Sequence, residues 1–305
     1  MERCRPEVGW EEPGVTDRDG GGCEPWRSLP SAFVGEAVAD EPLSGGAVND
    51  VRRLTLADGT RVVLKSSEQA PPDLYAQEAE GLRVLREQGG LRTPRVIEVS
   101  ARHLLLEALE PAPADGDAFW AEAGRAVARL HAVRGDRFGW HAEGWLGLLP
   151  QTNAWTDDGH AFFAEHRVLR YLREPKVRAA LDPADLAGLE RICDRLPRLM
   201  PGGPAVLNHG DLYQGNVVAA SDGAPAFIDP AVCWMWAESE LSMMYCTGRP
   251  PESFFAAYHE VLPLPDGWRE RMPLLHLREL ISTIAHFGAW GDCVPQVRDV
   301  IRRFG

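Results

Sequence analysis

The segment 204–230, PAVLNHGDLYQGNVVAASDGAPAFIDP, constrains the fold more than any other part of the chain. It begins with a short strand pattern and continues, after a polar loop, into two strand-like runs joined by a turn. If the hairpin is centred between Asp222 and Gly223, Asn216 lies directly opposite Asp229. Opposed residues have Cβ atoms about 4.5–5.5 Å apart. The segment therefore predicts an amide and a carboxylate close together at the open end of a hairpin.

Asp211 lies in the polar loop, five residues before Asn216, which is the D-x-x-x-x-N spacing of kinase catalytic loops. Asn216 and Asp229 offer the hard oxygen ligands that suit Mg²⁺. Taken singly, each of the three residues is explained as well by turn chemistry. The set of three at these spacings is far more specific, and it indicates a phosphoryl-transfer site.

Such a site needs a second group of polar residues, and the strand RVVLK with the helix after it supplies candidates. Lys65 ends the strand, and Glu78 falls between Leu82 and Leu85 on the apolar stripe of the helix. Glu78 could reach water from the edge of this stripe. A carboxylate on a buried face is costly unless it is paired. Together with the Asp211 set, we therefore favour an ion pair between Lys65 and Glu78.

The composition and the strand and helix patterns divide the chain into an N-terminal tail and two lobes. The predicted fold class is α+β, with one β-rich and one mostly helical lobe. Residues 1–30 are rich in Gly, Pro and charge, and we expect a mobile tail. Residues 31–109 predict a small β-rich lobe with one helix, including a hairpin at Asp58-Gly59. Residues 110–305 predict a larger, mostly helical lobe, with the joint between the lobes at 111–115.

Three aspartates are expected to cap helices of these two lobes. The first precedes the helix of the small lobe, and the others open helices of the large lobe. They are Asp73, Asp117 and Asp182.

Charge and cysteine spacing exclude several classes of protein. Thirty-two Lys and Arg against 45 Asp and Glu give a net charge of −13, which argues against nucleic-acid binding and against attraction to anionic lipid. No run approaches the roughly 18 consecutive apolar residues of a membrane span. The six cysteines form no C-x-x-C pair. We expect a cytoplasmic protein with reduced thiols, and a monomer rather than an oligomer.

On these and further motifs, the chain from about residue 31 to 305 resembles the fructosamine kinase (ketosamine 3-kinase) family. HGDLYQGNV at 209–217 is similar to the family's HGDLWxGN, with Tyr213 at the usual Trp, and FIDPA at 227–231 resembles its metal-binding segment. The most family-specific stretch is FGWHAEGWLGLLPQTNAWTDDGHAFFAEHRV, residues 138–168. FFAAYH at 254–259 and HFG at 286–288 add to the resemblance.

The resemblance implies a two-lobed kinase-like fold that binds ATP and Mg²⁺ and phosphorylates the 3-hydroxyl of a ketoamine, which leads to deglycation. It implies that Asp211 is the catalytic carboxylate, that Asn216 and Asp229 hold Mg²⁺, and that Lys65, oriented by Glu78, contacts the α- and β-phosphates. It further implies that Gly45 and Gly46 cover the phosphates and that the backbone of a hinge at Glu107 and Leu109 contacts adenine. The residues that it implies on the acceptor side are Trp234, Trp236, Glu238 and His286.

The chain departs from the family pattern on the acceptor side. Met235-Trp236 stand where the family usually has Gly-His, and Ser282, Thr283 and Ala285 replace positions that are often Asn, His and Asn. Two alternatives therefore stay open. One is a kinase-like phosphotransferase for another hydroxyl, such as that of an aminoglycoside, and the other is a nucleotide-binding regulator without turnover.

Overall fold

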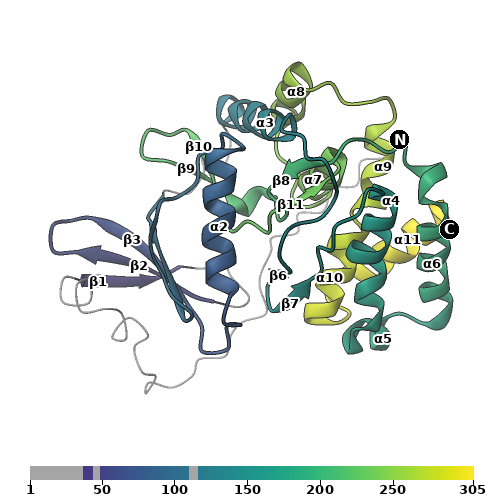
Figure 1. The fold of residues 1–305 in the computed structure, drawn as a ribbon, viewed down its shortest axis with the longest axis horizontal. Helices are drawn as coiled ribbons and strands as arrows, with labels where there is room; N and C mark the ends of the chain where they lie inside the picture. Colours follow the sequence, from purple (N-terminus) through teal and green to yellow (C-terminus); the bar gives the residue numbers. More distant parts are fainter. Residues whose placement is uncertain (1–36, 44–48, 110–115) are drawn as a thin grey trace.

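The computed structural model describes residues 37–43, 49–109 and 116–305, and it has two parts of different secondary structure (Figure 1). We call the described residues up to 109 the N-terminal lobe, which is built on a β-sheet, and those from 116 onward the C-terminal lobe, which is mostly helical. This is the α+β architecture that the sequence predicts. Within the described ranges, no helix combines the length and the apolar character needed to cross a membrane. The segment 1–30, Gly45, Gly46 and the expected joint at 111–115 lie outside the described residues.

A five-stranded antiparallel sheet with the strand order β1-β2-β3-β5-β4 forms the N-terminal lobe. The predicted turn between β2 and β3 is confirmed, and Gly59 adopts a φ of 84° there, which suits a residue without a Cβ. The single helix of this lobe, α2, packs against β4 and β5 and lies between the sheet and the C-terminal lobe (Figure 1). The elements are β1 (Ala37–Pro42), β2 (Asp50–Leu56), β3 (Arg61–Ser66), α2 (Leu74–Glu87), β4 (Val96–Val99) and β5 (His103–Glu107).

The C-terminal lobe surrounds one large apolar core, to which most of its helices contribute. Short strands pair as β6 with β7, β8 with β11, and β9 with β10. The strands are β6 (Gly144–Leu146), β7 (Leu149–Gln151), β8 (Val206–Asn208), β9 (Val217–Ala219), β10 (Pro225–Phe227) and β11 (Cys233–Met235). The helices are α3 (Asp117–His131), α4 (Gly159–Phe163), α5 (Pro175–Ala180), α6 (Pro183–Leu199), α7 (Ala237–Cys246), α8 (Glu252–Val261), α9 (Trp268–Leu275), α10 (Leu277–Phe287) and α11 (Cys293–Phe304).

Close packing of α3 on α8 anchors the first helix of this lobe. Gly124 lies on α3 where a Cβ would collide with the carbonyl oxygen of Phe254 on α8, so only glycine allows this approach. His131, at the end of α3, thereby comes within 2.8 Å of the hydroxyl of Tyr258 on α8. This buried pair belongs to the polar network described below.

Of the three predicted helix caps, only Asp182 caps its helix with its side chain. It accepts hydrogen bonds from two backbone N–H groups in a capping box with Asp185. Asp73 occupies the N-cap of α2, but its carboxylate accepts from the side chains of Gln77 and Trp145 instead. The prediction for Asp117 is wrong by one residue, because Gly116 is the N-cap and Asp117 begins the first turn, where its charge still suits the helix dipole.

Candidate active site

Strands β9 and β10 form the predicted hairpin, but the predicted register is wrong by one residue. Val217 pairs with Phe227, and the N–H of Ile228 donates to the carbonyl oxygen of Asn216 at 3.0 Å. Ile228 is therefore the residue opposite Asn216. Asp229 lies one position beyond, where the chain leaves the hairpin.

The turn of the hairpin explains this difference. The strands are closed by a three-residue loop, 221–223, in which Gly223 has a φ of 79°. Three-residue hairpin loops place such a left-handed residue at their end, and the centre of the loop is then Asp222 itself. Asp229 also has a positive φ, 58°, which is uncommon for a residue other than glycine. This left-handed turn sets the direction in which the Asp229 carboxylate leaves the hairpin.

Lys65 joins the two lobes at this point. Its ammonium group donates to Glu78 of α2 at 2.6 Å and contacts the carboxylate of Asp229. The Lys65 side chain is 6% exposed and that of Glu78 is 12% exposed, whereas that of Asp229 is 36% exposed. Burial alone would lower the pKa of Lys65, but the two carboxylates outweigh it and raise that pKa, so the ammonium stays charged. The predicted Lys65–Glu78 ion pair is thus present.

Asp211 faces the same region from the loop after β8. The side-chain nitrogen of Asn216 donates to the carbonyl oxygen of Asp211 at 2.7 Å and lies 3.4 Å from its carboxylate. Burial raises the pKa of Asp211 to about 7, with Asp229 and Glu279 adding to the shift and Arg278 opposing it. A carboxylate with a pKa near neutrality is suited to accept and release a proton.

The loop before Asp211 is held by His209, which is fully buried. The N–H of Asp211 donates to Nδ1 of His209 at 3.3 Å, so the proton of the ring lies on Nε2, which donates to the carbonyl oxygen of Ile228 at 2.9 Å. Burial lowers the pKa of His209 and keeps the ring neutral. His209 therefore links the loop to the end of the hairpin.

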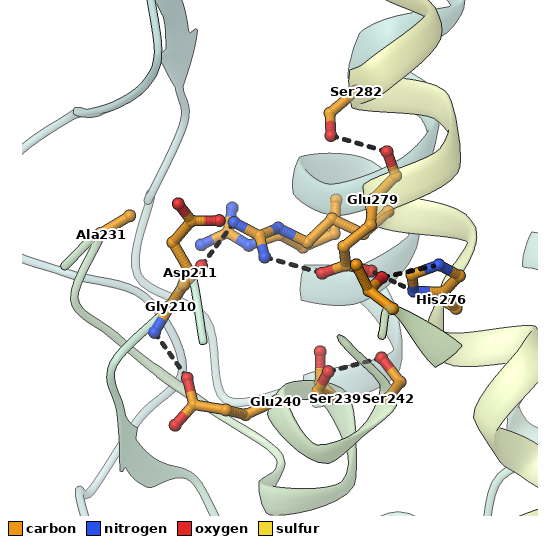
Figure 2. Close-up of polar contacts among 12 residues, drawn as sticks. Gly210, Asp211, Ala231, Ser239, Glu240, Ser242, His276, Glu279 and Ser282 are labelled. Carbon is orange, nitrogen blue, oxygen red and sulfur yellow. Dashed lines mark hydrogen bonds and ion pairs between the residues drawn. The ribbon is translucent and has the colours of Figure 1, made fainter. Parts of the chain in front are cut away.

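Glu240 of α7 holds the same loop from the other side. Its carboxylate accepts from the backbone N–H of Gly210 at 2.6 Å (Figure 2). It also accepts from the backbone N–H of His209 at 3.0 Å and from Nε2 of His131 at 2.9 Å. Burial would raise the pKa of Glu240, but these hydrogen bonds and the nearby histidines hold it below its usual value. A buried carboxylate thus orients two consecutive peptide groups before Asp211.

The oxygen atoms available as ligands at the end of the hairpin fit a magnesium ion. Because the Asn216 nitrogen donates to Asp211, its amide oxygen is the end left for a ligand, and Asp229 adds a partly exposed carboxylate. No group of three or more His, Cys, Asp or Glu among the described residues could hold a metal ion. Mg²⁺ does not need such a group, since it commonly takes one or two protein ligands and completes its shell with phosphates and water.

The predicted hinge follows β5. The side chain of Glu107 accepts from the backbone N–H of Arg95 at 3.1 Å, and the N–H of Ala108 donates to the carbonyl oxygen of Arg61 at 3.4 Å. Leu109 is the last described residue before the gap. The two lobes therefore connect directly after the strand next to that of Lys65, where a hinge is expected.

The four residues predicted for the acceptor side have different surroundings in the structure. Trp234 is partly exposed and packs near Trp140, with ring centroids 6.3 Å apart. Trp236 is 4% exposed and packs against Phe163 and other rings of the core. The carboxylate of Glu238 forms a two-point ion pair with Arg271.

The ring of the fourth residue, His286, bonds through both nitrogens to backbone carbonyl oxygens, those of Ser282 and Leu146. Three of the four side chains are thus engaged within the protein: Trp236, Glu238 and His286. Acceptor contact by these four residues stays a prediction, and Trp234 is the one whose side chain is partly exposed and has no polar partner of this kind among the described residues.

Sequence reasoning missed two charged residues that hold the site, Glu240 and Arg278. Arg278 donates to the carbonyl oxygen of Gly210 at 2.6 Å. The signal for Arg278 was present, since Arg278-Glu279 interrupts the apolar run LLHLRELISTIA, and charges in a buried helix require partners. Glu240 lies in ESELS, whose three other polar residues are buried as well, so the sequence offers no contrast that singles Glu240 out.

Comparison with solved structures first defines the class. The fold matches that of the choline kinase LicA from Streptococcus pneumoniae with a TM-score of 0.61 at 15% identity, covering 88% of this chain and 93% of that one. At that identity the match concerns the fold alone. The protein thus has the two-lobed kinase-like fold.

Closer relatives define the family. The fructosamine kinase family model matches residues 31–304. A Thermus thermophilus protein named "probable ketoamine kinase" is 36% identical over 250 residues, which cover 81% of this chain and 87% of that protein. A crystal structure from Thermobifida fusca, named "putative fructosamine-3-kinase", matches with a TM-score of 0.79 at 32% identity, covering 89% and 96% of the two chains. The chain belongs to the fructosamine kinase family, as its sequence motifs predict.

Proposed function

We propose that this protein is an ATP- and Mg²⁺-dependent kinase that phosphorylates the 3-hydroxyl of ketoamines, the sugar adducts of amines and lysine side chains. The chain is a member of the fructosamine kinase family, and its two lobes bring four polar side chains together. The proposal rests on these residues, which are Lys65, Asp211, Asn216 and Asp229. The relative from Thermus thermophilus, named a ketoamine kinase, supports this acceptor class. The phosphorylated product is unstable and releases the amine, so the role we propose is deglycation.

Asp211 is the proposed catalytic carboxylate. One carboxylate oxygen of Asp211 accepts the proton of the acceptor hydroxyl while the hydroxyl oxygen attacks the γ-phosphorus of ATP. The bond between that phosphorus and the β–γ bridging oxygen breaks, and ADP leaves. A pKa of about 7 keeps the carboxylate partly deprotonated at neutral pH and basic enough to take a proton. The hydrogen bond from Asn216 holds the carboxylate in a fixed orientation. In phosphoryl transfer most of the catalysis is positioning and charge neutralisation.

Lys65, Asn216 and Asp229 are the proposed nucleotide and metal residues. Asn216 Oδ1 and the Asp229 carboxylate would hold Mg²⁺, which neutralises charge on the phosphates when it is bound. The Lys65 ammonium would contact the α- and β-phosphates, and Glu78 keeps it aimed at the cleft. We assign contact with adenine to the backbone of Glu107 and Leu109, and contact with the phosphates to Gly45 and Gly46, which lie outside the described residues.

A direct assay tests this function. The purified protein is incubated with Mg·ATP and a panel of fructosyl-, ribulosyl- and erythrulosyl-lysine, and phosphorylated products are detected by mass spectrometry. Asp211→Asn is the matched control, because it keeps the shape of the side chain and removes its basicity. We expect phosphorylation of at least one member by the wild type, and a rate lower by at least about 10²-fold with the variant.

Two results would contradict the proposal. If an aminoglycoside is phosphorylated and every ketoamine is left unchanged, the protein acts on a different acceptor. If ATP binds with micromolar affinity in calorimetry and no acceptor is phosphorylated over a day, the protein is a nucleotide-binding regulator.

A further inference from the structure

The peptide groups that precede Asp211 are hydrogen-bonded at both ends. In the peptide between His209 and Gly210, the N–H donates to Glu240 and the carbonyl oxygen accepts from the N–H of Ala231 at 2.9 Å. In the next peptide, between Gly210 and Asp211, the N–H donates to His209. Its carbonyl oxygen is the remaining end, and Arg278 binds it.

Gly210 makes this arrangement sensitive to small rotations. It has a φ of 86°, and a Cβ there would collide with the carbonyl oxygen of Ala231. A glycine in this conformation has freedom that other residues lack, so its backbone needs external contacts to stay in one orientation. The carbonyl oxygen lies in the peptide that carries Asp211, and a rotation of that peptide moves the carboxylate.

Arg278 reaches this oxygen from α10, an element distant in sequence from the loop. Its side chain is 7% exposed. One guanidinium nitrogen donates to Gly210 at 2.6 Å and to the side chain of Gln151 on β7 at 3.0 Å, and another donates to Glu279 at 2.8 Å. The cation therefore bridges the loop, a strand and its own helix.

A small cavity lies next to the loop, and Arg278 is one of the residues that line it. It is lined by Gly210, Glu240, Arg278 and Glu279, and its volume is about 10 Å³. Arg278 Nε and one oxygen of Glu279 are buried without a hydrogen-bond partner in the structure. A space of this size holds about one water molecule.

We propose that Arg278 is a positioning residue for phosphoryl transfer, which holds the Gly210–Asp211 peptide so that the Asp211 carboxylate faces the acceptor hydroxyl. Glu240, an anion, accepts from the N–H of the first of these peptides, and Arg278, a cation, donates to the carbonyl oxygen of the second. Charge-assisted hydrogen bonds of this kind are about twice as strong as neutral ones. The inference rests on the proposed function, because it assigns a role within that reaction.

The test separates positioning from binding by steady-state kinetics with a ketoamine that the wild type phosphorylates. We expect Arg278→Gln to lower kcat by roughly 10- to 100-fold, since a misplacement of about 1 Å can cost 10²-fold. KM for ATP should change less than about threefold, because Lys65 and Asp229 are untouched. Arg278→Lys keeps the charge and a donor, and it should recover most of kcat.

Removal of Arg278 alone leaves Glu279 buried without its cation, which can unfold the protein. The double variant Arg278→Gln/Glu279→Gln removes both charges and keeps the test usable. It should fold and still show the low kcat, because the bond to Gly210 is missing. Arg298→Gln is the matched control. It breaks the ion pair of α11 with Asp185 on α6, outside the site, and should leave kcat at the wild-type value.

A second measurement does not depend on the acceptor. Hydrogen exchange by mass spectrometry should show faster exchange of peptides covering 208–212 in the double variant and no change in Arg298→Gln. Wild-type kcat in the double variant, or unchanged exchange at 208–212, overturns the role of Arg278. If the wild type phosphorylates no ketoamine, the proposed function fails, and the exchange result still decides whether Arg278 holds the loop.

Discussion

The site has two halves that are held in different ways. The loop before Asp211 is fixed by buried side chains of the C-terminal lobe alone, and Glu240, His209 and Arg278 bond its peptide groups one after another. The half around Lys65 is assembled from β3, α2 and the end of the hairpin, and it is held by charge between side chains. The first half is therefore built before any ligand arrives.

The second half is built to change when a ligand arrives. Asp229 is partly exposed, and its present partner is the ammonium of Lys65. In the proposed function, phosphates take Lys65 and Mg²⁺ takes Asp229, so the bond between them is replaced. We infer that the loop carrying the proton acceptor is held rigidly, whereas the nucleotide side of the site can rearrange. The predictions below test this division, from the largest effect to the smallest.

Asp211→Asn should separate catalysis from stability most clearly. We expect kcat to fall by about 10²–10⁴-fold, as for a positioned acid–base group. The raised pKa of Asp211 means that folding disfavours its charged form, so the neutral amide should raise the stability at pH 8, with an upper limit of about 4 kcal/mol from the shift of its pKa from 3.8 to about 7. Kinetics and thermal unfolding at pH 8 check both parts. A variant that is less stable than the wild type would show that Asp211 has a structural role.

Glu240→Gln should weaken the rigid half. The amide cannot accept all three hydrogen bonds that the carboxylate accepts, and we expect a loss of about 2–3 kcal/mol in the free energy of unfolding. Urea unfolding measures this loss. If the stability changes by less than about 0.5 kcal/mol, the buried network is not what fixes the loop.

Glu78→Gln should affect the adjustable half with little change in stability. The amide keeps a hydrogen bond to Lys65 but removes the charge that aims the ammonium. We expect kcat/KM for ATP to fall about tenfold, which corresponds to about 1.4 kcal/mol, while the urea midpoint stays near the wild-type value. A variant with full kcat/KM for ATP would show that Lys65 is positioned by other contacts.

The pH dependence of stability should report the neutral His209. Burial lowers the pKa of His209 in the folded state, whereas an unfolded histidine titrates near 6.5. As the pH falls below about 6.5, the unfolded chain binds a proton that the folded chain does not, so stability falls with falling pH. Urea unfolding gives the free energy of unfolding at pH 7.5 and at pH 5.5. Between these two pH values, this free energy should fall by about 1 kcal/mol more for the wild type than for His209→Asn. Equal differences would contradict a buried neutral ring.

The sequence predicted the two halves unequally, for physical reasons. The Lys65–Glu78 pair was predictable, because a carboxylate on an apolar stripe requires a partner and the adjacent strand offered one. The hairpin was predicted with the wrong register, since the choice of loop depends on Gly223 adopting a left-handed backbone. That choice moved Asp229 by one position relative to Asn216.

The contacts that fix the loop could not be predicted in the same way. Glu240 and Arg278 lie 30 and 68 residues from Gly210, and only the packing of α7 and α10 brings them to it. Trp236 was predicted for the acceptor side from the family resemblance, because Met235-Trp236 stand where the family usually has Gly-His. Its side chain instead packs in the core, because Trp236 is the N-cap of α7, where the alternation of β11 has ended and both Met235 and Trp236 are buried.

A crystal structure with Mg²⁺ and a non-hydrolysable ATP analogue tests the central division of the site most directly. The hydrogen bonds of Gly210 to Glu240 and Arg278 should remain, while Lys65 leaves Asp229 for the phosphates and Asp229 ligates the metal. A complex in which the Gly210 bonds are broken, or in which Lys65 stays on Asp229 with nucleotide bound, would contradict this account.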